Sequence, residues 1–139
     1  MRFQQYGKTC QLKIGTADEL DDILSLDESL WVATSAPSAA FRCDPRFTAF
    51  LDQNNSGRVN SDEVKAAVMW LLSVLSDRSH VEQATDALPL AALNTNLPEG
   101  RALQESARRV LEAGGKADSD TISLRDVRGF VDGLSLIHI

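Results

Sequence analysis

Apolar residues in this chain recur mainly three and four positions apart, which is the spacing of an α-helix with one buried face. On this spacing, helices are predicted over 44–51, 61–75 and 98–113, and a further helix from Leu124 onward. Residues 16–19, Thr-Ala-Asp-Glu, form a capping box and predict the start of a short acidic helix. Because helical spacing dominates, a mainly α fold is expected.

The first 43 residues differ from this pattern. Residues 3–14 are rich in strand formers and predict a short hairpin or a single strand. Residues 31–40 are small and punctuated by Ser and Pro, so we expect an extended connection with Trp31 as an anchor. Residues 1–43 are therefore expected to form a small extended or β element that packs on a helical core.

A polar twelve-residue stretch, from Asp52 to Glu63, separates two of the predicted helices. Its alternate residues Asp52, Asn54 and Ser56 would direct side-chain oxygens toward one centre, and Gly57 permits the backbone turn that a Cβ resists. Glu63, in the first turn of the next helix, can close the loop with both carboxylate oxygens. A hard cation such as Ca²⁺ is bound by six to eight oxygens of this mixed kind.

In these residues the stretch 52–63 resembles the calcium loop of the EF-hand family. The resemblance implies a helix–loop–helix fold with one calcium site. It implies six ligating residues, five through side chains and Arg58 through its backbone carbonyl: Asp52, Asn54, Ser56, Arg58, Asn60 and Glu63. Apolar residues at the spacing of a buried helix face follow the loop: Val64, Ala67, Val68 and Leu71. Phe47 and Leu51 on the preceding helix are expected to face inward. The alternative is a polar turn between helices that binds nothing.

The predicted site has little ligand charge. Among the six residues only Asp52 and Glu63 are formally charged. Because ligand charge helps to set calcium affinity, we expect a dissociation constant of roughly 10⁻⁵ to 10⁻³ M. Mg²⁺ is the expected competitor, although it prefers a tighter octahedral shell that retains water.

A second, degenerate loop is predicted at 115–126. This loop has an apolar residue, a helix cap and a closing carboxylate at the same places as the first loop. They are, in that order, Ile122, Ser123 and Asp126. The first two oxygen ligands are missing, so we expect an empty structural partner that pairs through a strand contact between Val59 and Ile122. The alternative is weak ion binding through the oxygens that remain: Asp118, Ser119 and Asp126.

The two loops predict an EF-hand-like helix–loop–helix pair over 44–133, preceded by the element at 1–43. Residues 76–97 must then form a long connection between the hands. The last six residues, 134–139, resemble a translated frame of the transposase adapter used in sequencing libraries. They are interpreted as a non-native tail, the alternative being a genuine apolar C-terminus.

Composition narrows the class of function. The chain has 139 residues with 14 basic and 20 acidic side chains, a formal net charge of −6. This balance argues against nucleic acid and anionic membranes as partners, and no apolar run is long enough to span a membrane. Two cysteines and two histidines, without a nucleophile–base pair, form no catalytic constellation, so the chain is not expected to be an enzyme by itself. No signal peptide is recognised, and a cytoplasmic location is expected.

These observations predict a calcium-binding regulatory or sensor module at the N-terminus of a longer protein. It would act on a protein partner or on a downstream domain of the same chain. Two alternatives remain open. One is a structural module in which calcium only stabilises a fixed helix pair, and the other is the non-catalytic N-terminal part of a larger enzyme.

Overall fold

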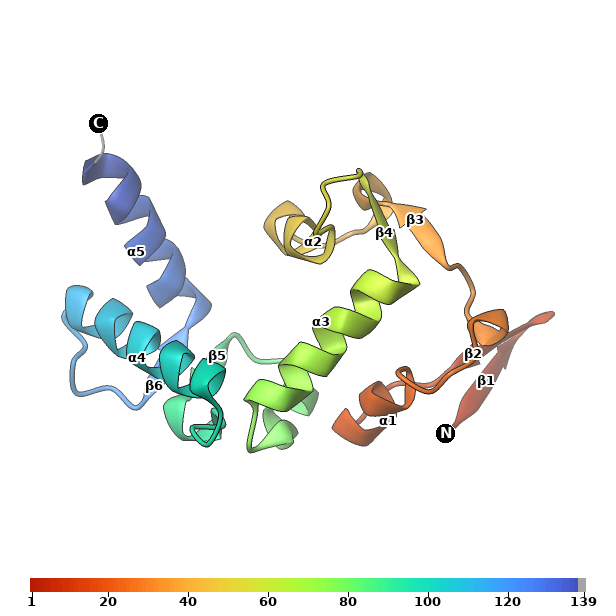
Figure 1. Ribbon diagram of the computed structural model, residues 1–139, viewed down its shortest axis with the longest axis horizontal. Helices are drawn as coiled ribbons and strands as arrows, with labels where there is room; N and C mark the ends of the chain where they lie inside the picture. Colours follow the sequence, from red (N-terminus) through yellow and green to blue (C-terminus); the bar gives the residue numbers. More distant parts are fainter. Residues whose placement is uncertain (138–139) are drawn as a thin grey trace. The chain divides into compact units, whose positions relative to one another are not determined.

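The computed structural model describes residues 1–137, with side chains described as far as residue 133 (Figure 1). The structure has 51% helix and 17% strand, and its described strands form three small antiparallel sheets of two strands each. The fold is therefore mixed α/β, and the expectation of a mainly α fold built on one helix pair is wrong. Apolar spacing missed most strands because they are three residues long, too short to display alternation. The interpretation of 134–139 as a tail falls on side chains outside the described part.

The chain divides into two compact units, Met1–Leu72 and Ser73–Ile139, and the boundary lies inside the helix that follows the first loop. Each unit contains one of the two predicted loops, and in each unit a short strand of that loop pairs with a preceding segment of the same unit.

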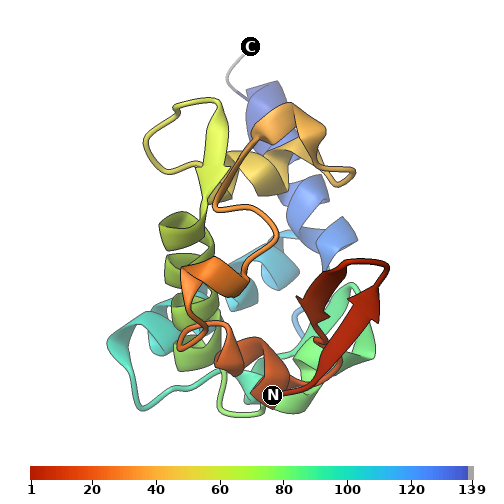
Figure 2. The same cartoon turned by 90° about the vertical axis from the view of Figure 1, so that its right-hand side faces the viewer.

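The first unit opens with a hairpin of β1 (Phe3–Tyr6) and β2 (Thr9–Leu12), shown in red in Figure 2. The two strands pair antiparallel with Phe3 opposite Leu12. The hairpin confirms the prediction that residues 3–14 form extended structure.

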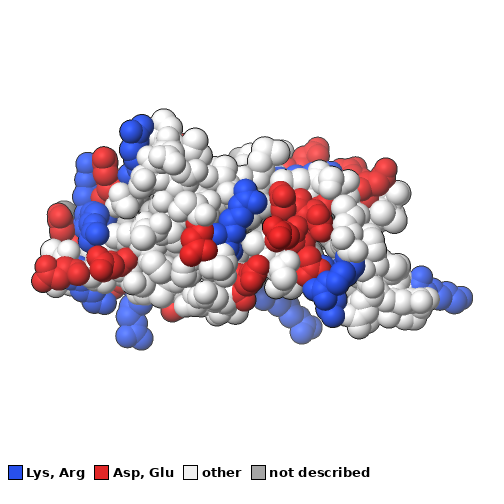
Figure 3. Space-filling view, turned by 90° about the horizontal axis from the view of Figure 1, so that it is seen from below, with Lys and Arg blue, Asp and Glu red and all other residues white. Residues whose placement is uncertain are grey.

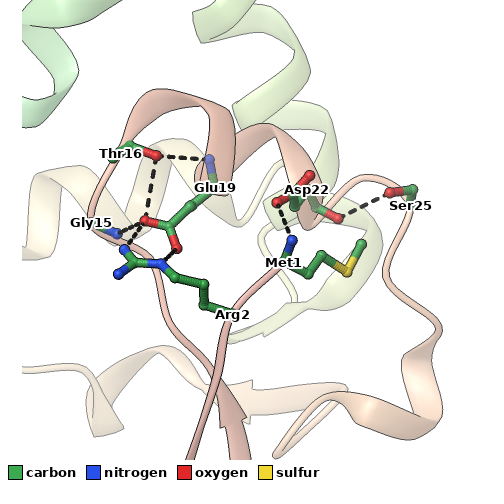
Figure 4. A network of polar contacts seen from close by, with 7 residues as sticks. All are labelled: Met1, Arg2, Gly15, Thr16, Glu19, Asp22 and Ser25. Atoms are coloured by element: carbon green, nitrogen blue, oxygen red, sulfur yellow. Dashed lines mark hydrogen bonds and ion pairs between the residues drawn. The ribbon is translucent and has the colours of Figure 1, made fainter.

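An ion pair ties the hairpin to helix α1 (Ala17–Asp22), as Figure 4 shows. Arg2 Nε donates to Glu19 Oε2 at 2.7 Å, and the buried Glu19 also accepts from Gly15 N at 3.2 Å. Glu19 N donates to Thr16 Oγ1 at 3.1 Å, which confirms the helix start predicted at Thr16, although the backbone N–H that reaches the Glu19 carboxylate is that of Gly15. The hydrogen bond from Arg2, opposed by burial and assisted by Gly15, lowers the pKa of Glu19 to about 2.

Six further elements complete the described part of the first unit and its exit helix. They are η1 (Glu28–Leu30), β3 (Ser35–Pro37), η2 (Ser38–Ala40), α2 (Pro45–Leu51), β4 (Arg58–Asn60) and α3 (Ser61–Val74). β3 pairs antiparallel with β4, and this pairing places Ala36 opposite the buried Val59. The segment expected to be a plain connection therefore supplies a strand to the candidate calcium loop.

The core of the first unit lies between α3 and the N-terminal segment. Ile23, Val68 and Leu72 are buried together. Partly buried apolar side chains pack around them: Leu12, Leu20, Leu24, Trp31 and Val64. The apolar face predicted for the helix after the loop is thus buried or half-buried, as expected.

Helix α2 differs from the prediction in the side chain that it buries. Phe47 is 56% exposed, so the expectation that it faces inward is wrong. Thr48 is buried instead, and its hydroxyl donates to Pro45 O at 3.0 Å. Because the helix backbone satisfies that hydroxyl, Thr48 can occupy the inward position without leaving an unpaired polar group.

The second unit has the same order of elements around its loop. It contains η3 (Arg78–Gln83), β5 (Ala87–Pro89), η4 (Leu90–Ala92), α4 (Pro98–Ala113), β6 (Thr121–Ser123) and α5 (Leu124–Ile137). Leu90, Ala107 and Leu111 form its core, and Ile122 packs against them. β5 pairs antiparallel with β6, which places Leu88 opposite Ile122.

These pairings correct the expected strand contact between Val59 and Ile122. Each of the two residues pairs inside its own unit, with Ala36 and with Leu88 respectively. In each unit a preceding segment, residues 35–37 or 87–89, supplies the strand that pairs with the loop.

Charged side chains of both signs are interspersed on the face seen in Figure 3, and the acidic ones lie at several places on it. Among the described helices, none combines the length and the apolar character that crossing a membrane requires.

Glu19→Gln should reduce the acid sensitivity of the fold. The folded-state pKa of Glu19 is about 2, and its ordinary pKa is 4.5. The ion pair of Glu19 therefore stabilises the folded chain fully at a pH above this ordinary pKa. That stabilisation is lost as the pH falls through the folded-state pKa of Glu19. Urea unfolding from about pH 5 to about pH 2 should therefore show a smaller loss of stability in the variant than in the wild type. Glu105→Gln, at an exposed position of α4, is the control, and parallel curves for Glu19→Gln and wild type would contradict the ion pair.

Candidate metal centre

The candidate centre is the loop at 52–63, which joins α2 to α3 (Figure 1). Asp52 ends α2 as its C-cap, with its N–H donating to Thr48 O at 3.0 Å. Two loop residues have left-handed backbone conformations, Asn55 with φ of 53° and Gly57 with φ of 82°. A Cβ at Gly57 would meet no heavy atom within 4 Å, so glycine serves the backbone conformation there rather than a close approach.

Asp52 is buried in its own loop, with 7% of the residue exposed. Its Oδ1 accepts from Ser56 N at 3.0 Å and its Oδ2 accepts from Gly57 N at 2.8 Å. Burial raises the pKa of Asp52, but the hydrogen bonds from Gly57 and Ser56 outweigh it and leave the pKa below its usual value. The carboxylate is therefore ionised at neutral pH.

Ser56 links two further candidate oxygens. Its hydroxyl lies 3.1 Å from Asp52 Oδ1 and 3.0 Å from the carbonyl oxygen of Arg58. Three of the predicted ligand atoms thus form a continuous row. The hydroxyl carries one proton, so it can donate to only one of its two neighbours at a time.

Glu63 closes the loop from the first turn of α3, and 8% of the residue is exposed. Its Oε2 accepts from Gln53 N at 2.8 Å and its Oε1 accepts from Asn60 N at 3.1 Å. Asn60 Oδ1 accepts in return from Glu63 N at 2.9 Å, which makes a reciprocal cap on α3. One carboxylate thereby joins the beginning of the loop to its end.

Neither buried carboxylate has a basic partner among the residues that the structure describes. Within the described residues, no Lys, Arg or His nitrogen lies within 4.0 Å of Asp52 or Glu63. The guanidinium of Arg58 is directed elsewhere, since its Nε donates to Ser35 Oγ at 2.9 Å. Two negative charges in one short loop repel each other, and burial reduces the screening by water. Oxygen ligation of a divalent cation fits this charge distribution.

The ligand set is one of oxygens. In the described part of the chain, no group of three or more His, Cys, Asp and Glu side chains could hold a metal ion. The candidate centre instead combines two carboxylates with hydroxyl, amide and carbonyl oxygens, a set that suits Ca²⁺ and Mg²⁺ rather than softer metals.

The side chains of two predicted ligands, Asn54 and Asn60, make no hydrogen bond to the other predicted ligand side chains within the described loop. The side-chain oxygen of Asn60 caps α3, as described above. Asn54 is exposed, and its side chain makes no hydrogen bond to any described residue. Metal ligation by the full set of six residues stays a prediction.

Sequence reasoning missed the segment that braces the loop. Ser38 N donates to Gly57 O at 2.9 Å, and Ser61 N donates to Thr34 O at 2.9 Å. These bonds hold β4 at both ends of its pairing with β3. A signal was present in the sequence, because 36–40 (Ala-Pro-Ser-Ala-Ala) resembles the stretch at 88–92 (Leu-Pro-Leu-Ala-Ala).

The loop at 115–126 repeats the second half of this hydrogen-bond pattern. Ser119 Oγ donates to Thr121 O at 2.8 Å, and the equivalent Ser56 Oγ lies 3.0 Å from Arg58 O in the first loop. Ser123 and Asp126 cap α5 reciprocally, with Ser123 N 2.9 Å from Asp126 Oδ2 and Asp126 N 3.1 Å from Ser123 Oγ. The hydrogen bonds agree with the register predicted for this loop from its serine onward.

Comparison of the chain with models of protein families finds no match, and neither curated proteins nor solved structures match it. The case for a metal centre therefore depends on the loop itself, and the resemblance of 52–63 to the EF-hand loop stays a prediction.

Gly57→Ala and Gly129→Ala should change stability in opposite directions. A Cβ in the left-handed region costs about 1–2 kcal/mol, so the first variant should unfold at lower urea concentration. Gly129 lies inside α5 with no heavy atom within 4 Å of an added Cβ, and alanine should stabilise the helix there by about 0.4–1 kcal/mol. Urea unfolding in the presence of a chelator measures both effects. An unchanged or stabilised Gly57→Ala variant would contradict the conformation of the loop.

Proposed function

We propose that this chain binds one calcium ion through the loop at 52–63, as a regulatory or sensor module of the EF-hand type. The proposal is carried by two buried carboxylates, Asp52 and Glu63, which lie at the two ends of one loop and have no basic partner among the described residues. A divalent cation would neutralise both charges. The target of the module would be a protein partner or a downstream domain of the same chain.

The hydrogen bonds of the loop are compatible with ligation. A carboxylate oxygen has two lone pairs, so each oxygen of Glu63 can keep its N–H donor and also bind an ion. The single proton of Ser56 cannot satisfy Asp52 and Arg58 together. An ion bound by these three oxygens would supply positive charge to all of them at once. Asn54 and Asn60 would complete the set, Asn60 directly or through water.

The affinity of the proposed site has two opposing determinants. Asn54, Ser56 and Asn60 are neutral, which favours a dissociation constant of roughly 10⁻⁵ to 10⁻³ M. The backbone donors already hold Asp52 and Glu63, so little ordering of these two side chains would accompany binding. Mg²⁺ would compete for the same oxygens.

Glu63→Gln should raise the calcium dissociation constant by at least about tenfold, because it removes one of the two ligand charges. The Gln oxygen can still accept from Asn60 N, so the cap of α3 is retained. Asp62→Asn is the matched control, since it removes the same charge from the neighbouring exposed residue and should change the constant less than about twofold. Titration calorimetry measures both, and equal effects would refute a specific site.

A structural role for calcium is the second candidate, and the bracing of the loop favours it. β4 is paired with β3, and Val59 is buried, so the second half of the loop has little freedom to rearrange around an ion. In this role calcium would stabilise the first unit without changing the surface that it presents.

Calcium titration with a hydrophobic dye separates the two roles. A sensor should expose apolar surface and increase dye fluorescence, whereas a structural site should raise the melting temperature without new dye binding. Trp70, an exposed residue of α3, provides an intrinsic fluorescence signal for the same titration. If neither dye binding nor melting temperature responds to calcium while Mg²⁺ is absent, both roles are refuted.

A further inference from the structure

The two loops differ in the groups that compensate the negative charge of their closing carboxylate. Lys116 Nζ donates to Asp126 Oδ1 at 2.7 Å, and the side chain of Asp126 is 12% exposed. Lys116 takes the second place of its loop, where the first loop has Gln53. The hydrogen bond from Lys116, followed by that from Ser123 N, lowers the pKa of Asp126 to about 2, so the carboxylate is ionised at neutral pH. Glu63, its counterpart, accepts from two backbone donors and has no cationic side chain beside it in the described part of the chain.

The charges of each loop match a different cation. Asp52 and Glu63 provide two buried negative charges in the first loop, which suit a divalent ion. In the second loop, Asp126 provides one largely buried charge, which suits one ammonium group. Asp120 does not add to it, because its side chain is 93% exposed and lies 3.7 Å from Arg108 Nη2.

The first half of the second loop also has a different backbone. In the first loop the left-handed residues are the fourth and the sixth, Asn55 and Gly57. In the second loop the left-handed residue is the first, Gly115, with φ of 75°. A ligating side chain at that position would be strained, and Ala117 offers no side-chain oxygen at the third place.

We propose that the ammonium of Lys116 is the resident cation of the second loop. It binds the closing carboxylate of Asp126, excludes a divalent ion from that place and holds β6 in the fold without metal. The proposal concerns 115–126 and does not depend on calcium binding at 52–63.

Amide hydrogen exchange of the full chain in a chelator tests the role of Lys116. Two amides report on the second loop: Leu90 N, which donates to Asp120 O at 2.8 Å, and Leu124 N, which donates to Asp86 O at 2.9 Å. Lys116→Gln should speed their exchange about five- to tenfold, because it leaves the closing carboxylate without a cationic partner. Lys116→Arg retains the charge and should stay within about twofold of wild type.

The equivalent amides of the first unit are the internal control. Ser38 N and Ser61 N, which make the corresponding bonds, should exchange at the wild-type rate in the same sample. Loss of protection confined to the second unit supports the proposal, even where that unit unfolds completely. A change below about twofold at the second-loop amides, or an equal change in both units, overturns it.

A double variant distinguishes the charge of Lys116 from its hydrocarbon stem. Asp126→Asn removes the negative charge while its amide oxygen can still accept from Ser123 N. In this background, Lys116→Gln should have less than about a twofold further effect on exchange. An undiminished effect would mean that Lys116 acts through packing and would overturn the ion-pair role.

Calcium titration of the wild-type chain followed by amide NMR tests the exclusion of the ion. Resonances of 115–126 should not move at saturating calcium, and a saturable shift there overturns the proposal. The outcome at 52–63 is separate. An unresponsive first loop would refute the proposed function, while the results for Lys116 in a chelator would still stand.

Discussion

The loops of this chain depend on a three-residue strand that is held by another segment of the same unit. Val59 in β4 pairs with Ala36, and the amides of Ser38 and Ser61 fix the two ends of that pairing. The pairing buries Val59, orients the Arg58 carbonyl next to Ser56 and sets the starting point of α3. An isolated pair of short strands is marginal in water, so packing of Val59 and of the following helix must supply the rest of its stability.

The two loops share the second half of their hydrogen-bond pattern and differ in the partner of their closing carboxylate. A carboxylate that is largely removed from water, as Asp126 is with 12% of its side chain exposed, is destabilising when its charge is left uncompensated. In the second loop, Lys116 supplies the compensating charge inside the chain. In the first loop, the carboxylates of Asp52 and Glu63 receive only N–H and O–H donors from described residues.

The parts of the fold that could be predicted are those encoded by local spacing. The helices and the loop register follow from helical periodicity and from fixed offsets between residues such as Gly57 and Glu63. β3 could not be predicted this way, because three residues show no alternation and its partner β4 lies far along the chain. Phe47 was misplaced because the burial of α2 depends on tertiary packing. The role of Lys116 was missed because the position of a lysine in the sequence does not show in which direction its long, flexible side chain points.

The same bracing limits where a response to calcium could arise. A ligand shifts a conformational equilibrium only through contacts that differ between the two states. β4 and the start of α3 are already fixed by β3 and by the cap between Asn60 and Glu63, so they offer few such contacts. Helix α2 is less constrained, since it buries Thr48 while Phe47 and Phe50 remain exposed. Because α2 ends at Asp52, an ion bound by Asp52 and Glu63 would act on the orientation of α2, and a sensor built on this loop would signal through that helix.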